Sequence, residues 1–201
     1  MIAALYVADD GPYVNRPDVD AWTIARDARE YDGPFSVVAH PPCERWGRYW
    51  GGGPSAKVKR RKGADAGCFY SALWAVREFG GVLEHPAHSY AWDRFGIDEP
   101  TPGFGWSSTE CGGYVCQVEQ GHYGHRARKA TWLYAVKCDL PEFIWGKSTG
   151  ERLDEGFHSK AERDAARAAG RKPIKRLSKR ECVHTPNAFA EILISMAATV
   201  R

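Results

Sequence analysis

Four side chains in this sequence are of types that act together in nucleophilic chemistry, and each lies close to the end of an apolar run. They are Cys43, which follows two prolines, Glu84, which precedes a His-Pro pair, and Arg126 and Arg128, which follow a Tyr-Gly pair. A thiolate is a soft nucleophile, a carboxyl group gives or takes a proton, and arginine stabilises developing negative charge. This set indicates the addition of a thiol to an electron-poor carbon, assisted by an acid.

Short apolar runs ended by proline, glycine or charged residues predict the strands that would position these side chains. The predicted strands cover residues 2–8, 35–39, 82–84, 114–120 and 130–136, and helical spacing predicts helices over 18–30, 64–79, 161–169 and 186–198. Strands that alternate with helices indicate an α/β fold with a Rossmann-like, mostly parallel sheet and flanking helices. The working residues of such sheets lie just beyond the carboxyl ends of strands, where Cys43 and Glu84 fall.

The length of 201 residues fits one folded domain. We expect residues 1–145 to form an α/β domain of catalytic type, and residues 146–201 to form a basic polar insertion and a C-terminal helix that packs on the same domain. No apolar run approaches the roughly 20 residues that span a bilayer, and the amino-terminal residues lack the pattern of a signal peptide. These features predict a cytoplasmic protein without a membrane partner, whose six cysteines are thiols.

The net charge of +3 conceals two strongly basic segments. Five cations lie within six positions, at Lys57, Lys59, Arg60, Arg61 and Lys62, and six more lie between Arg171 and Arg180 without an acidic residue. Such runs bind phosphate groups because each neutralised phosphate releases condensed counterions, although a solvated loop or helix end has the same composition. Arg45, Trp46 and Lys129 complete the predicted nucleic-acid-binding set, Trp46 as a ring that either stacks on bases or packs in the core.

A second group of residues has to be weighed as a metal site. Its members are Cys111, Cys116, His122 and His125. Zinc sites use more closely spaced cysteine pairs, and the predicted strand 114–120 would separate these side chains. We therefore predict no bound metal.

Over about residues 34–137 the sequence resembles the DNA cytosine-5 methyltransferase family, because several of its motifs occur in the same order. Pro42-Cys43 matches the catalytic Pro-Cys, and the glycine-rich, basic loop 51–62 with Asp65 at the start of a helix matches the next segment. Glu84-His85-Pro86 corresponds to Glu-Asn-Val or Glu-Asn-Pro, and the later Tyr-Gly with spaced arginines also has a counterpart. The likeness is greatest to small phage-encoded members, whose tails carry a similar Thr-Pro-x-x-Phe helix, and this implies the host cytoplasm as the location.

The resemblance implies a DNA-binding transferase that methylates C5 of cytosine with S-adenosyl-L-methionine as its cofactor. Cys43 would add to C6 of the base, and Glu84 would hydrogen-bond the ring nitrogen N3. Arg126 and Arg128 would hold the base carbonyl or a flanking phosphate. A base in duplex DNA must first be flipped out of the helix, which the basic loop would assist.

The cofactor-binding part departs most from the family. The first predicted strand ends in Ala-Asp-Asp-Gly-Pro instead of Phe-x-Gly-x-Gly, so Asp9 and Asp10 are the candidate cofactor-binding residues. The chain between Asp9 and Cys43 is short, and the fold is expected to be truncated relative to S-adenosylmethionine-dependent methyltransferases. Two alternatives stay open: a catalytically degenerate nucleic-acid-binding phage protein on the same fold, and a nucleotide-level pyrimidine-modifying enzyme that uses another one-carbon donor.

Overall fold

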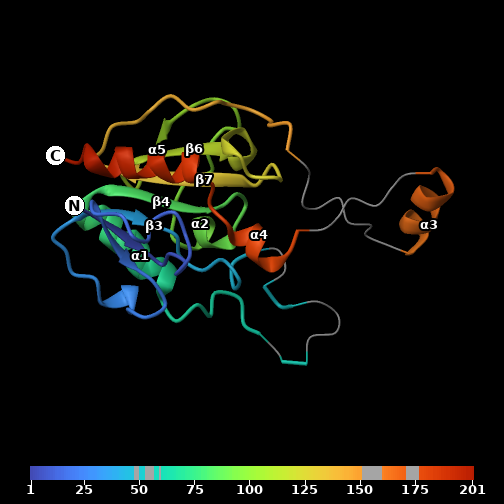
Figure 1. Ribbon diagram of the computed structural model, residues 1–201, viewed down its shortest axis with the longest axis horizontal. Coiled ribbons are helices and arrows are strands. Elements are labelled where there is room, and N and C mark those ends of the chain that lie inside the picture. The colour runs from blue at the N-terminus through green and yellow to red at the C-terminus, as the bar shows by residue number, and fades with distance from the viewer. Residues whose placement is uncertain (48–49, 53–56, 59, 151–159, 171–176) are drawn as a thin grey trace.

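The computed structural model describes residues 1–47, 50–52, 57–58, 60–150, 160–170 and 177–201, except for the side chains of 160, 162, 163 and 179. Within these residues seven strands form one sheet (Figure 1) in the order β2-β1-β3-β4-β7-β6-β5. The strands are β1 (Ile2–Leu5), β2 (Val19–Trp22), β3 (Ser36–Ala39), β4 (Gly81–Pro86), β5 (Ser107–Ser108), β6 (Tyr114–Glu119) and β7 (Ala130–Val136).

The sheet has a parallel half and an antiparallel half. Strands β2, β1, β3 and β4 are parallel, whereas β7 pairs antiparallel with β4, β6 with β7, and β5 with β6. The expected α/β fold with a Rossmann-like sheet and flanking helices is confirmed, and both candidate strand ends belong to the parallel half. A Cβ at Gly81 would lie 2.0 Å from the Val37 carbonyl oxygen, so glycine is needed where β4 begins beside β3.

Helices cover both faces of the sheet. The α-helices are α1 (Cys68–Phe79), α2 (Tyr90–Arg94), α3 (Lys160–Ala168), α4 (Lys179–Val183) and α5 (Asn187–Ala198), and the 3-10 helices are η1 (Ala28–Glu30) and η2 (Gln120–Tyr123). Helix α1 packs against β3 and β4 on one face, and α5 packs against β1, β3 and β4 on the other. Among the described helices, none is long and apolar enough to cross a membrane.

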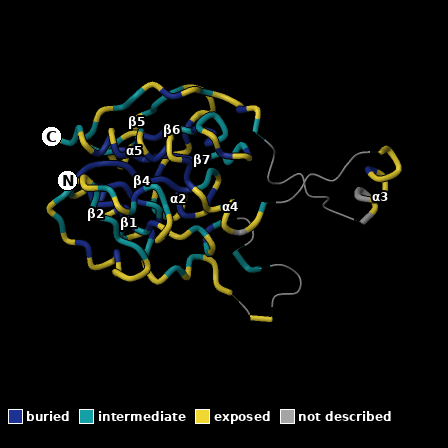
Figure 2. Tube along the Cα trace, in the orientation of Figure 1, coloured by how far each residue is buried: buried dark blue, intermediate teal, exposed yellow. Residues whose placement is uncertain are grey.

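The strands at the centre are buried on both faces, as their dark blue colour in Figure 2 shows. Alternate residues of β1 and β3 belong to two separate apolar clusters: Leu5 and Val37 pack on the α1 side, and Ala4 and Val38 pack on the α5 side. This alternation follows from the two-residue period of a strand. The same alternation determines which side chains lie on the same face of the sheet at the carboxyl ends of β3 and β4.

The predicted helix over residues 18–30 is wrong. Residues 19–22 form the edge strand β2, and only the short turn η1 is helical. Pairing with β1 supplies backbone hydrogen bonds that the local sequence pattern does not reveal. The side chains of Asp20 and Trp22 lie on the same side of the strand, and Trp22 Nε1 donates to Asp20 at 2.9 Å.

Candidate active site

The carboxyl ends of β3 and β4 bring the main candidate residues to one edge of the sheet. Ala39 lies beside Leu83 in the parallel register, so His40 and Glu84 are the next pair along the two strands. Both side chains therefore lie on the α5 side, and the Pro-Pro pair after His40 carries the chain on to Cys43.

A cavity of about 510 Å³ opens at this edge. It is lined by residues 6–8 and 10–13 after β1, residues 40–43 after β3, Glu84 and Pro86 of β4, Lys129 before β7, and residues 180 and 182–185 of α4 and its continuation. The volume lies in the range of about 300–1,000 Å³ that is typical of small-molecule sites. Cys43 and Glu84, predicted separately from the sequence, therefore line one cavity.

Glu84 belongs to a hydrogen-bonded network that joins five segments of the chain. His40 Nδ1 is 2.9 Å from Glu84 Oε2, and His40 Nε2 is 2.7 Å from the Tyr13 hydroxyl. Gln120 Nε2 donates to the other carboxylate oxygen, Oε1, at 3.0 Å and also contacts the Thr131 hydroxyl at 3.0 Å. Each Glu84 oxygen thus has one partner from a different neighbouring element.

The same network sets the ionisation of Glu84. Burial by itself disfavours the carboxylate, but the hydrogen bond and charge of His40 and the charge of Lys129 outweigh burial and lower the pKa of Glu84 to about 2. Glu84 is therefore ionised at neutral pH and accepts hydrogen bonds. To act as an acid toward a ring nitrogen it must first receive a proton, and His40 is the side chain placed to supply it.

Cys43 is half-buried and is a free thiol. Burial raises the pKa of Cys43, the negative charge of Glu84 raises it further, and the positive charge of Lys129 lowers it. The thiol is therefore mostly protonated at neutral pH, and Lys129 favours the thiolate that a nucleophile requires.

Lys129 is a cation that lines the cavity with Cys43 and Glu84, a role that the sequence suggests for Arg126 or Arg128. Its ammonium donates to the His184 carbonyl oxygen at 2.6 Å, and its backbone has a φ of 46°, a left-handed conformation that is uncommon for lysine. The sequence predicts Lys129 as a nucleic-acid contact, and the structure places it beside Glu84 and Cys43.

Replacing Lys129 with methionine is expected to raise the pKa of Cys43, because a nearby positive charge is removed while the side-chain length is kept. Alkylation of Cys43 by iodoacetamide at pH 8 should become several-fold slower, with the rate profile moved to higher pH. Peptide mass spectrometry would follow Cys43, with Cys68 outside the cavity as the internal reference. Equal slowing at both cysteines would contradict a local effect.

Arg126 and Arg128 are not among the described residues that line the cavity with Cys43 and Glu84. Their role in holding the base carbonyl or a flanking phosphate stays a prediction. Arg126 Nε is 3.4 Å from a carboxylate oxygen of Glu181, and Arg128 Nε donates to the Gly150 carbonyl oxygen at 3.3 Å. Arg126 thus contacts helix α4, and Arg128 contacts the loop at Gly150. The Arg128 carbonyl oxygen also accepts from the backbone of Gly121 in η2 at 3.0 Å.

Trp46 is a core residue, and its prediction as a base-stacking side chain is corrected. Its ring is 5% exposed, packs at 5.8 Å from the ring of Phe95, and donates through Nε1 to Asp65 at 2.7 Å. Asp65 also accepts from the backbone of Phe69 at 2.9 Å, which places it at the start of α1 as the motif predicts. The half-buried Arg45 closes the base of the basic loop, because its carbonyl oxygen accepts from Gly63 at 3.0 Å.

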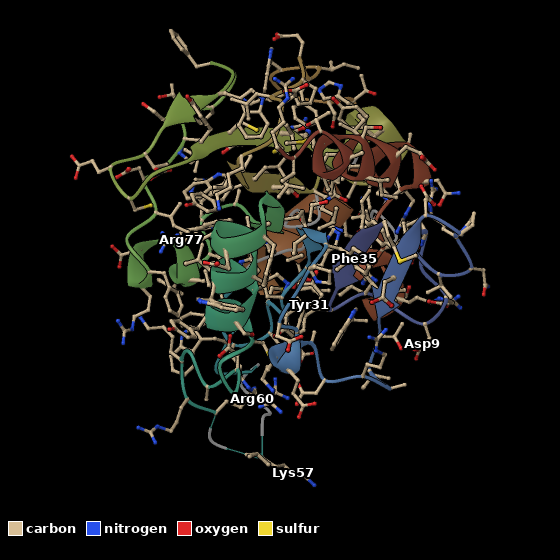
Figure 3. All side chains as sticks on the ribbon, turned by 90° about the vertical axis from the view of Figure 1, so that its left-hand side faces the viewer. Asp9, Tyr31, Phe35, Lys57, Arg60 and Arg77 are labelled. Atoms are coloured by element: carbon tan, nitrogen blue, oxygen red, sulfur yellow. The ribbon has the colours of Figure 1, made fainter. Side chains whose placement is uncertain are left out.

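In the described part of the basic loop, Lys57 and Arg60 lie away from the sheet (Figure 3). Lys57, Arg60, Arg61 and Lys62 are exposed, and Lys59 lies outside the described residues. Lys62 Nζ lies 4.2 Å from the ring centre of Tyr90, itself an exposed aromatic residue. The loop is thus a cationic surface with an aromatic ring at its base.

The residues after β1 and β2 do not fit S-adenosylmethionine in the way the resemblance implies. Asp9, labelled in Figure 3, is exposed. It is not among the residues that line the cavity, whereas Asp10 lines it and pairs with Arg180. Asp27, the first carboxylate after β2, accepts hydrogen bonds from Arg29. Asp10 and Asp27 are thus each paired with an arginine, and the candidate cofactor-binding residue Asp9 faces solvent.

The candidate zinc residues are dispersed. Cys116 is buried in the apolar cluster under α5, whereas Cys111 is exposed in the turn before β6. Both ring nitrogens of His125 contact backbone carbonyl oxygens, at 3.0 and 2.9 Å. Among the described residues, no group of three or more His, Cys, Asp or Glu side chains is arranged to hold a metal ion.

Sequence reasoning missed Tyr13, His40, Gln120 and the segment 182–185 as parts of the site. His40 had a usable signal, because it is a polar residue at the end of an apolar strand, three positions before Cys43. Tyr13 and Gln120 had no such signal in the sequence, since only the order of strands in the sheet brings them to His40 and Glu84.

No model of a known protein family matches this chain, and no curated protein sequence matches it either.

Proposed function

We propose that this protein is a pyrimidine-modifying enzyme of the DNA cytosine-5 methyltransferase type, in which Cys43 adds to C6 of the base. The observation that supports the proposal most is the single cavity that Cys43, Glu84 and Lys129 line together at the ends of β3 and β4. A thiol, a carboxyl group and a cation are the three functions that the addition requires.

The proposed step begins with the Cys43 thiolate, whose lone pair forms a bond to C6. The electrons of the C5–C6 double bond move toward C5 and the ring nitrogen N3, where a proton from the Glu84 network neutralises the charge. Carbon 5 then has carbanion character and can react with an electrophilic one-carbon group. Loss of the proton on C5, departure of the thiolate from C6 and return of the N3 proton to the Glu84 network restore the ring and the free cysteine.

Exchange of the hydrogen on C5 with solvent tests this activation without any donor. A base deuterated at C5 should lose its deuterium to water, because the thiolate adds to C6, C5 takes a proton from solvent, and the deuteron on C5 and the thiolate on C6 then leave. Both single-stranded oligodeoxynucleotides and deoxynucleoside 5′-monophosphates should be supplied, with deuterium measured by mass spectrometry. Exchange in the monophosphates alone would favour the nucleotide-level alternative, and no exchange in any form would refute the catalytic proposal.

The donor requires a separate experiment, because the carboxylates after β1 and β2 are engaged elsewhere. Titration calorimetry with S-adenosyl-L-methionine, carried to millimolar ligand, measures its binding directly. Heat that saturates at one ligand per chain would support methyl transfer. Absence of binding together with C5 exchange would favour another one-carbon donor.

The exposed cations of the basic loop are proposed to bind DNA phosphates. Replacing Arg60 and Arg61 with glutamine should reduce the slope of log K against log salt by about 0.9 for each phosphate that is no longer neutralised. Fluorescence anisotropy with a labelled duplex measures the slope, and glutamine at the exposed Lys137 and Lys147 provides a charge-matched control. Equal slopes for the two variants would exclude this loop as the DNA-binding surface, and binding without C5 exchange would favour the non-catalytic alternative.

A further inference from the structure

The His40–Glu84 pair has a feature that thiol addition alone does not require. The two side chains are 11% and 9% exposed, at the edge of the cavity, and a titratable ring is hydrogen-bonded directly to the carboxylate expected to face the base. A carboxylate with Gln120 as its only partner would have no proton source. His40 adds one, and histidine is the side chain that ordinarily changes charge between about pH 5 and 8.

The hydrogen atoms in the pair can be assigned from its partners. An ionised carboxylate only accepts, so His40 Nδ1 carries a hydrogen and donates to Glu84, and Gln120 donates to the other oxygen. With one hydrogen on the ring, His40 Nε2 accepts from the Tyr13 hydroxyl. A second proton makes His40 an imidazolium, from which Nδ1 can pass its proton to Glu84 as a base binds.

Pyrimidine rings differ at the atom that this carboxyl group would meet. A uracil-type ring has a hydrogen on N3 and therefore needs an acceptor. The N3 of cytosine has a lone pair and needs a donor, and a buried polar atom left without its partner costs about 1–3 kcal/mol. The number of protons on the pair thus determines which ring it can hydrogen-bond.

We propose that the His40–Glu84 pair selects the pyrimidine ring by its proton count. With one proton the pair accepts N3–H of a uracil-type ring, and with two it donates to N3 of a cytosine-type ring. This inference rests on the proposed addition of Cys43. It assigns the uracil-type ring as a substrate class of the same site at higher pH and cytosine as the class at lower pH.

The other titratable groups around the pair do not reproduce this behaviour. Burial raises the pKa of Tyr13 well above its ordinary value, so its hydroxyl keeps its hydrogen. Lys129 donates to a carbonyl oxygen, and Asp10 and Arg180 neutralise each other. His85 follows Glu84 on the opposite face, against Phe69, and Cys182 and His184 line the cavity on the α4 side. Ionisation of Cys43 affects both rings equally and cancels when their rates are compared.

The experiment measures C5 deuterium loss from matched cytosine and uracil substrates between about pH 5 and 8. The substrates are supplied as oligodeoxynucleotides or as monophosphates, according to which of the two the protein exchanges. The ratio of the cytosine rate to the uracil rate should rise by about tenfold or more as the pH falls across this interval. A ratio that stays constant within about twofold would overturn ring selection while leaving thiol addition intact. No exchange of either ring would overturn both proposals.

A variant separates His40 from other sources of pH dependence. His40→Asn keeps a donor for Glu84 but cannot take up a proton, so its ratio of the cytosine rate to the uracil rate should stay low and flat across this pH range. His88→Asn is the matched control, because His88 forms an exposed pair with Glu99 at 3.4 Å outside the cavity. A His40→Asn protein with the wild-type rise would overturn the proposal. Should that variant not fold, the wild-type ratio and that of Tyr13→Phe distinguish the outcomes, because Tyr13→Phe leaves the His40–Glu84 contact in place and should keep the rise.

Discussion

Cys43→Ser is expected to abolish C5 deuterium exchange, with a loss of about three orders of magnitude or more. A serine hydroxyl at this position is almost entirely un-ionised at neutral pH, and oxygen is a poorer nucleophile toward a polarised carbon–carbon double bond than a thiolate. The substitution removes little volume, and the surrounding cavity should stay intact. Mass spectrometry of the recovered base measures the loss.

The cavity contains its own control for this prediction. Cys182 is also a half-buried free thiol that lines the cavity, on the α4 side. Cys182→Ser should keep exchange within about twofold of the wild-type rate, because this thiol is not at the end of a parallel strand beside Glu84. Exchange that survives in Cys43→Ser and disappears in Cys182→Ser would identify Cys182 as the nucleophile and refute the proposed role of Cys43.

Glu84→Gln is expected to have the second largest effect, a fall in exchange of about 10²- to 10⁴-fold. The amide is neutral, cannot pass a proton to N3, and directs its own NH₂ group at a donor, since Gln120 Nε2 already points at this position. The same donor–donor contact should destabilise the fold by about 1–3 kcal/mol. Urea unfolding at pH 7 measures the stability loss.

A second buried carboxylate separates stability from activity. Glu119 accepts two hydrogen bonds from Ser148, at 2.6 Å from its backbone and 2.8 Å from its hydroxyl, and does not line the cavity. Glu119→Gln should also lower the free energy of unfolding but should retain exchange. A comparable loss of exchange in both variants would mean that Glu84 acts only through folding.

The stability effect of Glu84 has a defined pH dependence. Its pKa is lowered from 4.5 to about 2 by its partners, so its contribution to stability is fully present above about pH 4.5. The contribution is lost as the pH falls toward about 2, because the carboxylate is then protonated in the folded protein as well. The stability difference between wild type and Glu84→Gln should therefore shrink at pH 3. A difference that grew on acidification would contradict the lowered pKa.

Much of the fold is predictable because most of its longer strands are short apolar runs between clear turn residues. The predicted strand at 130–136 has the bounds that the structure has, and the predicted strands before His40 and at Glu84 agree with it to within a few residues. The edge strand β2 is not predictable in the same way. Its residues have helical spacing, and only the neighbouring β1 supplies the hydrogen bonds that make them a strand.

The residues of the candidate site also fall into those that the local sequence predicts and those that only tertiary contacts place. Cys43 and Glu84 can be found because each is a reactive residue next to a strand end, a property of the local sequence. Trp46 and the arginines at 126 and 128 cannot be placed from the sequence, because core packing and contacts with distant segments decide where such long side chains point. Lys129 lines the cavity because the turn before β7 brings it there.

The sequence by itself determined that an α/β sheet would carry a thiol and a carboxylate at its strand ends, since apolar periodicity and turn residues are local signals. Only the tertiary structure decided that His40 and Tyr13 would join Glu84, and that Lys129 would be the cation beside them. The physical reason is the register of β3 against β4 and the order of strands in the sheet. Both depend on contacts between residues far apart in the chain, and the sequence pattern of one segment does not indicate which distant segment it will contact.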